Sequence, residues 1–172
     1  IAFLEMVIDP VCSLVFDNET EEKDVMQRPP RGPEEPLFSR PLIGWSLLQG
    51  ALSLILVAAI FVVATQRGMP ENEVRALAFF SLVTTIVGLI VVNRSFSASI
   101  ATAILRPNLT LALVLAAVSA ILGLTLLWPF ASGLFRFGPL HFDDLSLTLG
   151  AGIFLLVTLE VIKPVWRRRL QA

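Results

Sequence analysis

The chain has 172 residues, of which 55% are hydrophobic and only 16% are charged, whereas soluble domains carry about 25% charged residues. Its net charge of −1 gives no basic surface for nucleic acid, and its one cysteine, Cys12, excludes an intrachain disulfide. The apolar residues form long blocks, and because a helix needs about 20 apolar residues to cross a bilayer, this pattern favours a membrane protein.

The first predicted element is the second half of a membrane-spanning helix, residues 1–16. It contains Glu5 and Asp9, which are four residues apart and therefore lie one turn apart on one helix face. Acids inside a membrane helix are costly and usually mark an ion path. Two carboxylates in this arrangement can bind a hard cation, and one should hold a proton when no cation is bound. Pro10 removes a backbone hydrogen bond beside Asp9 and frees carbonyl oxygens there.

Other interpretations of this element stay open. Glu5 could lie in the headgroup zone, the helix could be a soluble amphipathic one, and Pro10 could be an ordinary kink. Cys12 is better explained as filler than as a soft-metal ligand, because no second cysteine or histidine lies nearby. The chain opens at Ile1 with no initiator methionine and no basic leader, so we expect a piece of a longer protein rather than a signal peptide.

Residues 17–41 are predicted to form a polar, proline-rich loop. Its prolines hold the backbone extended and stiff, whereas a flexible linker would be richer in Gly and Ser. An acidic half comes before a basic half, and the two meet in the run Asp-Val-Met-Gln-Arg-Pro-Pro-Arg at residues 24–31. The simplest alternative is a solvated proline-rich loop without a further role.

The rest of the chain, residues 42–172, is predicted to be a four-helix membrane support domain. An open strand edge cannot be satisfied in lipid, so all spans should be helical. The fold class expected is an all-α membrane protein: a bundle of four complete transmembrane helices plus the C-terminal half of a preceding one. An outer loop is predicted at 131–144, and Lys163-Pro164 is predicted to end the last helix. The four predicted spans are 42–65, 74–92, 109–128 and 145–162.

The basic residues predict the orientation. If loop 17–41 is cytoplasmic, ten of the thirteen Lys and Arg residues lie on that side, which is a strong positive-inside bias. This places the C-terminus in the cytoplasm. The three on the other side are Arg67, Arg75 and Arg136.

These patterns together resemble the C-terminal membrane part of P-type cation pumps. Residues 24–37, Asp-Val-Met-Gln-Arg-Pro-Pro-Arg-Gly-Pro-Glu-Glu-Pro-Leu, resemble the calcium-pump loop Asp-Ile-Met-x-Arg-Pro-Pro-Arg-x-Pro-x-Glu-Pro-Leu. Residues 5–13, Glu-Met-Val-Ile-Asp-Pro-Val-Cys-Ser, resemble its sixth membrane helix, Asn-x-x-Thr-Asp-Gly-x-Pro-Ala. There Asp9 falls on the family's cation-liganding aspartate, Glu5 on its asparagine and Ile8 on its threonine. The Asp-Pro-x-Cys-Ser version is similar to a bacterial branch of these pumps.

The resemblance implies an ATP-driven cation translocase in a bacterial cell membrane, with Ca²⁺ or another cation as cargo at Asp9 and Glu5. ATP and Mg²⁺ would act only through upstream domains, since the chain has neither an Asp-Lys-Thr-Gly-Thr motif nor a Gly-rich phosphate loop, and no catalytic residue is expected in it. The implied partners are the upstream membrane helices, the cytoplasmic phosphorylation domain and the lipid bilayer, with no nucleic acid. The coupling loop to that domain would include Met26, Arg28, Pro29, Pro30 and Arg31.

One departure bears on the choice of ion. Val87 falls where the family's eighth helix can supply a glutamate to one of two calcium sites, so one site is expected to be absent or rebuilt, with Glu5 as a possible replacement ligand. Two rival functions stay open. A small stand-alone membrane accessory or scaffold protein would have its own start codon at residue 1, and a secondary transporter segment would show an inverted repeat, which is not evident.

Overall fold

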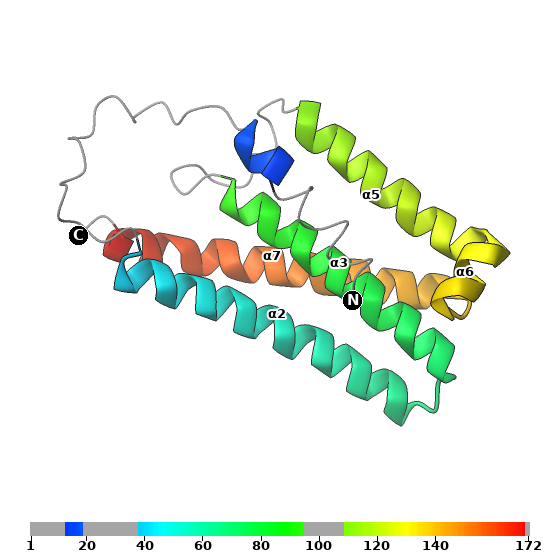
Figure 1. Ribbon diagram of the computed structural model, residues 1–172. Coiled ribbons are helices and arrows are strands. Elements are labelled where there is room, and N and C mark those ends of the chain that lie inside the picture. Colours follow the sequence, from blue (N-terminus) through cyan, green and yellow to red (C-terminus); the bar gives the residue numbers. More distant parts are fainter. Residues whose placement is uncertain (1–12, 19–37, 95–108, 171–172) are drawn as a thin grey trace.

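A computed structural model describes residues 13–18, 38–94 and 109–170, with side chains as far as Trp166. Within these ranges all regular structure is helical and no strand occurs. Residues 13–17 form a short helical stretch, in agreement with the predicted helix end at Phe16. The longer elements are α2 (Arg40–Gln66), α3 (Glu71–Asn93), α5 (Leu109–Leu127), α6 (Pro129–Phe135) and α7 (Phe142–Leu170) (Figure 1).

Four of these helices are long and apolar enough to cross a membrane: α2, α3, α5 and the part of α7 from Phe142 to Trp166. The four predicted spans are therefore confirmed as helices of membrane-crossing length. The helices extend one to three residues beyond the predicted spans at most ends, and α2 begins within the predicted loop 17–41.

The helix ends have local causes. The Ser39 hydroxyl accepts a hydrogen bond from the Leu42 amide at 3.3 Å and caps the start of α2. After α2 the chain turns through Gly68, whose φ of +71° is readily adopted only by glycine. Glu71 and Glu73 lie in the first turn of α3, where negative charge complements the helix dipole.

Two predictions at the end of the chain are wrong. The predicted outer loop 131–144 contains most of α6, which ends with Arg136 in the left-handed conformation, and the start of α7 at Phe142. In addition, α7 continues through Pro164 to Leu170 instead of ending at Lys163-Pro164. Proline removes one backbone hydrogen bond, but the exposed Pro164 lies near the helix end, where only a short segment depends on that bond.

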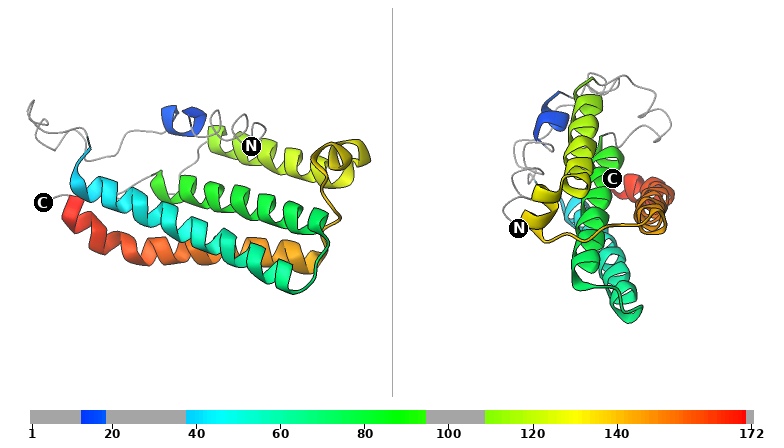
Figure 2. Two further views of the ribbon diagram at one scale, coloured as in Figure 1. Left: turned by 60° about the horizontal axis from the view of Figure 1, so that its bottom comes forward. Right: turned by 90° about the vertical axis from the view of Figure 1, so that its right-hand side faces the viewer.

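Helix α3 lies at the centre of the bundle, in contact with α2 and α7, which also contact each other. Figure 2 shows α5 on the side of α3 away from α7. Half of the apolar window of α3 is buried, against about a fifth for the other three helices. Two clusters join α2, α3 and α7, and their buried members are Trp45, Val92, Leu155 and Leu159 in one and Ile60, Ala64, Val74 and Leu77 in the other.

Glycine permits the closest approach between α3 and α7. A Cβ atom added to buried Gly152 would lie 2.5 Å from Thr84 Cγ2, and one added to Gly88 would lie 3.8 Å from the Gly152 carbonyl oxygen. Small residues at a crossing let helix backbones approach closely, which is a common device in membrane bundles. The pair Gly152 and Thr84 therefore sets the distance between these two helices.

The bundle has two chemically different ends. The end where α2 begins and where α3 and α7 finish is called the basic end, because Arg40, Arg94 and Lys163 lie there. At the opposite end α2 finishes and α3 and α7 begin. There the loop after α6 is held against α3 by a hydrogen bond of 2.9 Å from the Gly138 amide to the Asn72 carbonyl oxygen.

Candidate functional site

The predicted cation ligands and coupling loop lie outside the described residues. The structure therefore leaves these assignments as predictions. They are Glu5, Asp9 and Pro10 in the first segment and Met26, Arg28, Pro29, Pro30 and Arg31 in the loop.

Residues 13–17 are the described part of the predicted acid-bearing helix. Val15 is completely buried in an apolar cluster with residues of α3 and α5. The Asn18 side-chain amide donates a hydrogen bond of 2.9 Å to the Leu14 carbonyl oxygen and so satisfies one of the last backbone groups of this stretch. The buried partners of Val15 are Val83, Ile90, Val114 and Val118. The chain six residues after Asp9 is thus held against α3 and α5.

Val87 belongs to the partly buried residues that pack against the same cluster. The α3 position that the family resemblance singled out therefore lies on the side of α3 that receives Val15. The apolar side chain adds no oxygen ligand there. Glu71 and Glu73 are the acids of α3. They lie in its first turn, at the end of the bundle away from the basic end. Within the described part of the chain, no group of three or more His, Cys, Asp or Glu side chains could hold a metal ion.

A buried cation joins α7 to the end of α3. Lys163 is only 5% exposed, and its Nζ donates a hydrogen bond of 3.1 Å to the Val92 carbonyl oxygen. That carbonyl belongs to the last turn of α3, where a positive charge complements the helix dipole. Glu160 Oε2 lies 3.6 Å from the same Nζ, since a spacing of three residues places the two side chains on one face of α7.

A reciprocal amide pair joins α2 to α3 near the same end. Gln49 Nε2 donates to Asn93 Oδ1 at 3.0 Å, and Asn93 Nδ2 donates to Gln49 Oε1 at 3.1 Å. Asn93 also donates to the Leu89 carbonyl oxygen at 2.9 Å. Interhelical amide pairs in membrane bundles stabilise by about 1 kcal/mol each. This pair also fixes the rotation of α2 about its axis, because both amides must meet face to face.

A third contact ties α7 to the start of α2. The Trp166 indole Nε1 donates a hydrogen bond of 2.8 Å to the Pro41 carbonyl oxygen in the first turn of α2. The ring of Trp166 lies 6.0 Å from that of the buried Trp45, and a Cβ atom on Gly44 would lie 3.0 Å from Trp166. At the basic end, α7 therefore contacts both α2 and α3. These contacts lie where the predicted loop 17–41 meets α2.

We expect Trp166→Phe to lower the free energy of unfolding by about 1 kcal/mol, because it removes one partly buried hydrogen bond and keeps an aromatic ring against Trp45. The measurement is thermal unfolding of the full-length protein in detergent. Trp128→Phe is the matched control, since Trp128 is 51% exposed at the α5–α6 junction. Equal stability losses in the two variants would contradict the assigned contact.

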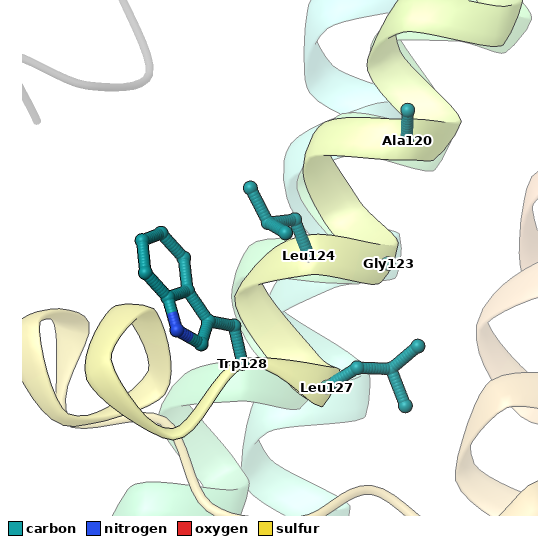
Figure 3. Close-up of a pocket in the computed structure, with 5 residues that line it drawn as sticks. All are labelled: Ala120, Gly123, Leu124, Leu127 and Trp128. Atoms are coloured by element: carbon teal, nitrogen blue, oxygen red, sulfur yellow. The ribbon is translucent and has the colours of Figure 1, made fainter.

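A shallow apolar cavity of about 680 Å³ lies at the junction of α5 and α6. Figure 3 shows its lining residues, with Leu124 and Trp128 projecting on the same side of the chain. It contains no titratable side chain, so it offers neither a proton carrier nor a cation ligand. The lining residues are Ala120, Gly123, Leu124, Leu127 and Trp128.

The described contacts therefore form a structural support. Val15 packs against one side of α3, and the first half of α2 packs against another side. The contacts of Gln49, Asn93 and Trp166 were missed in the sequence. The only signals were two amide side chains in largely apolar helices, Gln49 in the first half of α2 and Asn93 at the end of α3, and an indole beyond the last predicted span.

Comparison with known proteins identifies a family. A family profile described as "Cation transporting ATPase, C-terminus" covers residues 1–165, and therefore includes the segment with Glu5 and Asp9, the helices α2, α3 and α5, and α7 as far as residue 165. No curated protein is significantly similar to the chain.

Proposed function

Because the chain belongs to the C-terminal family of cation-transporting ATPases, we propose that it supplies the cation-binding acid and the supporting helices of an ATP-driven pump resembling calcium pumps. It is thus a membrane part of a P-type cation-transporting ATPase, with multiple membrane-spanning helices. Asp9 is the principal cation ligand, Glu5 is a second ligand or proton carrier, and Pro10 frees backbone carbonyl oxygens beside them.

The observation that carries this proposal is the family match across the whole acid-bearing segment, together with the family's loop sequence at residues 24–37. A carboxylate beside a proline inside a membrane helix is expensive unless it serves an ion. The burial of Val15 between α3 and α5 supports the proposal, since it shows that residues 13–17, which follow the acids, pack against the protein.

In the proposed cycle, upstream domains bind ATP and Mg²⁺ and form an aspartyl phosphate, which switches the site between two orientations. Residues 24–31 relay the movement of the phosphorylation domain, and the predicted loop that contains them ends at Pro41, which accepts the hydrogen bond from Trp166. The basic end faces the cytoplasm, as the excess of Lys and Arg there favours, and the membrane is that of a bacterial cell. The helices α2, α3, α5 and α7 support the site.

The choice of ion is testable because Val87 adds no carboxylate on the side of α3 that receives the acid-bearing helix. We expect a single high-affinity site, so one cation should be bound per phosphoenzyme. The measurement is phosphorylation of the full-length protein by ATP, titrated separately with Ca²⁺, Mn²⁺ and Na⁺ and at varied pH, with uptake into vesicles read in parallel. Phosphorylation that responds to no cation and transports none would overturn the proposed function.

A further inference from the structure

A second cavity, with a volume of about 450 Å³, lies at the opposite end of the bundle between the end of α2 and the first turns of α7. This volume is within the range of small-molecule sites, about 300–1,000 Å³. Its rim carries a guanidinium from Arg67 and carboxylates from Asp143 and Asp144. Its remaining wall follows one side of α7, formed by Ser146, Leu147, Gly150, Ala151 and Phe154.

The opposite charges on the rim face the same cavity without pairing with each other. Asp144 instead lies beside His141, with 3.7 Å between Oδ2 and Nδ1. Asp144 also accepts a hydrogen bond from the His141 amide and so caps α7. Arg67 and Asp143 are both exposed. The cavity therefore presents a positive and a negative group that are separated by open space.

The wall extends from the charged rim into the apolar part of the bundle. Phe154 lies ten residues beyond Asp144 on the same helix, which places it about 15 Å deeper along the axis. Leu147 and Phe154 are 40% and 66% exposed, and a Cβ atom added to Gly150 would meet nothing within 4 Å. Because α7 is of membrane-crossing composition, this exposed apolar wall lies at the depth of lipid acyl chains.

We propose that this cavity, named here the α2–α7 groove, binds one phospholipid with a zwitterionic, primary-amine headgroup of the phosphatidylethanolamine type. Arg67 contacts the phosphate, Asp143 and Asp144 accept hydrogen bonds from the ammonium group, and one acyl chain lies along Leu147, Gly150 and Phe154. The proposal depends on the membrane position of α2 and α7 and does not depend on the identity of the transported ion.

The charge pattern distinguishes this lipid from its common alternatives. A choline headgroup carries the positive charge but has no N–H donor for the two carboxylates. A glycerol headgroup leaves the phosphate charge uncompensated next to Asp143 and Asp144, and like charges repel. A primary ammonium has three N–H donors and a compact charge. It can therefore donate hydrogen bonds to both Asp143 and Asp144 while Arg67 contacts the phosphate.

The test measures lipid retention by native mass spectrometry on the detergent-solubilised full-length protein. Phosphatidylethanolamine, phosphatidylcholine and phosphatidylglycerol with identical acyl chains are added one at a time. We expect the ethanolamine lipid to be retained about tenfold better than the choline lipid, the factor that one charge-assisted hydrogen bond supplies. Arg67→Gln should reduce retention of all three lipids. Asp143→Asn should cut the tenfold preference to about twofold and raise retention of the glycerol lipid.

A blocking variant tests the position of the acyl chain. Gly150→Leu places a side chain in the groove at a position where an added Cβ atom meets nothing within 4 Å, so retention should fall while the unfolding temperature in detergent stays unchanged. Gly50→Leu is the matched control, because Gly50 is also an exposed helical glycine with open space around it but lies on α2 outside the groove. Equal retention of the three lipids, or unchanged retention in Arg67→Gln and Gly150→Leu, would overturn the proposal. Cation-dependent phosphorylation, measured in the same samples, reports separately on the proposed function.

Discussion

Replacing Asp9 with Asn in the full-length protein is expected to reduce cation-dependent phosphorylation by ATP at least about a hundredfold. Asparagine keeps the size of the side chain and one carbonyl oxygen, but it lacks the negative charge that a hard cation requires in a low-dielectric site. Removing one partner of a buried charge pair costs about 3–5 kcal/mol, which corresponds to a factor of a hundred or more in affinity. The measurement is the level of phosphoenzyme as a function of cation concentration.

Two controls separate ligand loss from misfolding. Asp17→Asn makes the same chemical change eight residues later, at an exposed position that follows the buried Val15, and it should leave phosphorylation unchanged. Glu5→Gln should weaken cation affinity less than Asp9→Asn, in keeping with its role as second ligand or proton carrier. A phosphoenzyme with normal cation dependence in Asp9→Asn would refute the assignment of the site.

Gly152→Ala is expected to destabilise the bundle by about 3 kcal/mol, the upper part of the range for overpacking a well-packed core. The added methyl group would lie 2.5 Å from Thr84 Cγ2, so α3 and α7 must separate or the threonine must leave its rotamer. Thermal or denaturant unfolding of the full-length protein in detergent measures the loss. Val15 also packs against α3, on a different side from α7. A displacement of α3 should therefore weaken the packing of Val15 as well.

A double-mutant cycle tests the cause. Thr84→Ala removes the clashing methyl group, so the pair Gly152→Ala with Thr84→Ala should recover most of the stability lost in the single variant. Gly150→Ala is the control on the same helix, two residues away, where an added Cβ meets nothing within 4 Å. It should be neutral or slightly stabilising, because alanine is the better helix former. A Gly150→Ala loss as large as that of Gly152→Ala would exclude the packing explanation.

The membrane helices could be predicted from the sequence because a bilayer requires long apolar runs, and α2, α3 and α5 match these runs closely. Helix α6 was missed because it has only seven residues and ends on Arg136 instead of on a glycine or asparagine. The end of α7 was placed too early because proline usually stops a helix. Near a helix end, however, Pro164 interrupts little of the remaining hydrogen bonding.

The interhelical contacts could not be predicted in the same way. Gln49 and Asn93 are 44 residues apart, and Lys163 and Val92 are 71 apart. Their meeting depends on how each helix is rotated about its axis, and the sequence pattern of an almost uniformly apolar helix leaves that rotation undefined. The pairing of Glu160 with Lys163 could be predicted because both lie on one helix, where a spacing of three residues brings side chains together. The cation ligands were proposed from the cost of membrane acids and from the family resemblance, and they lie outside the described residues.

The hydrogen bond between Trp166 and Pro41 joins groups 125 residues apart. During synthesis, α2 is therefore made long before Trp166. It enters the bilayer before the three further spans α3, α5 and α7 are inserted. The contact that joins α7 to the start of α2 is accordingly formed late, after α7 has been inserted.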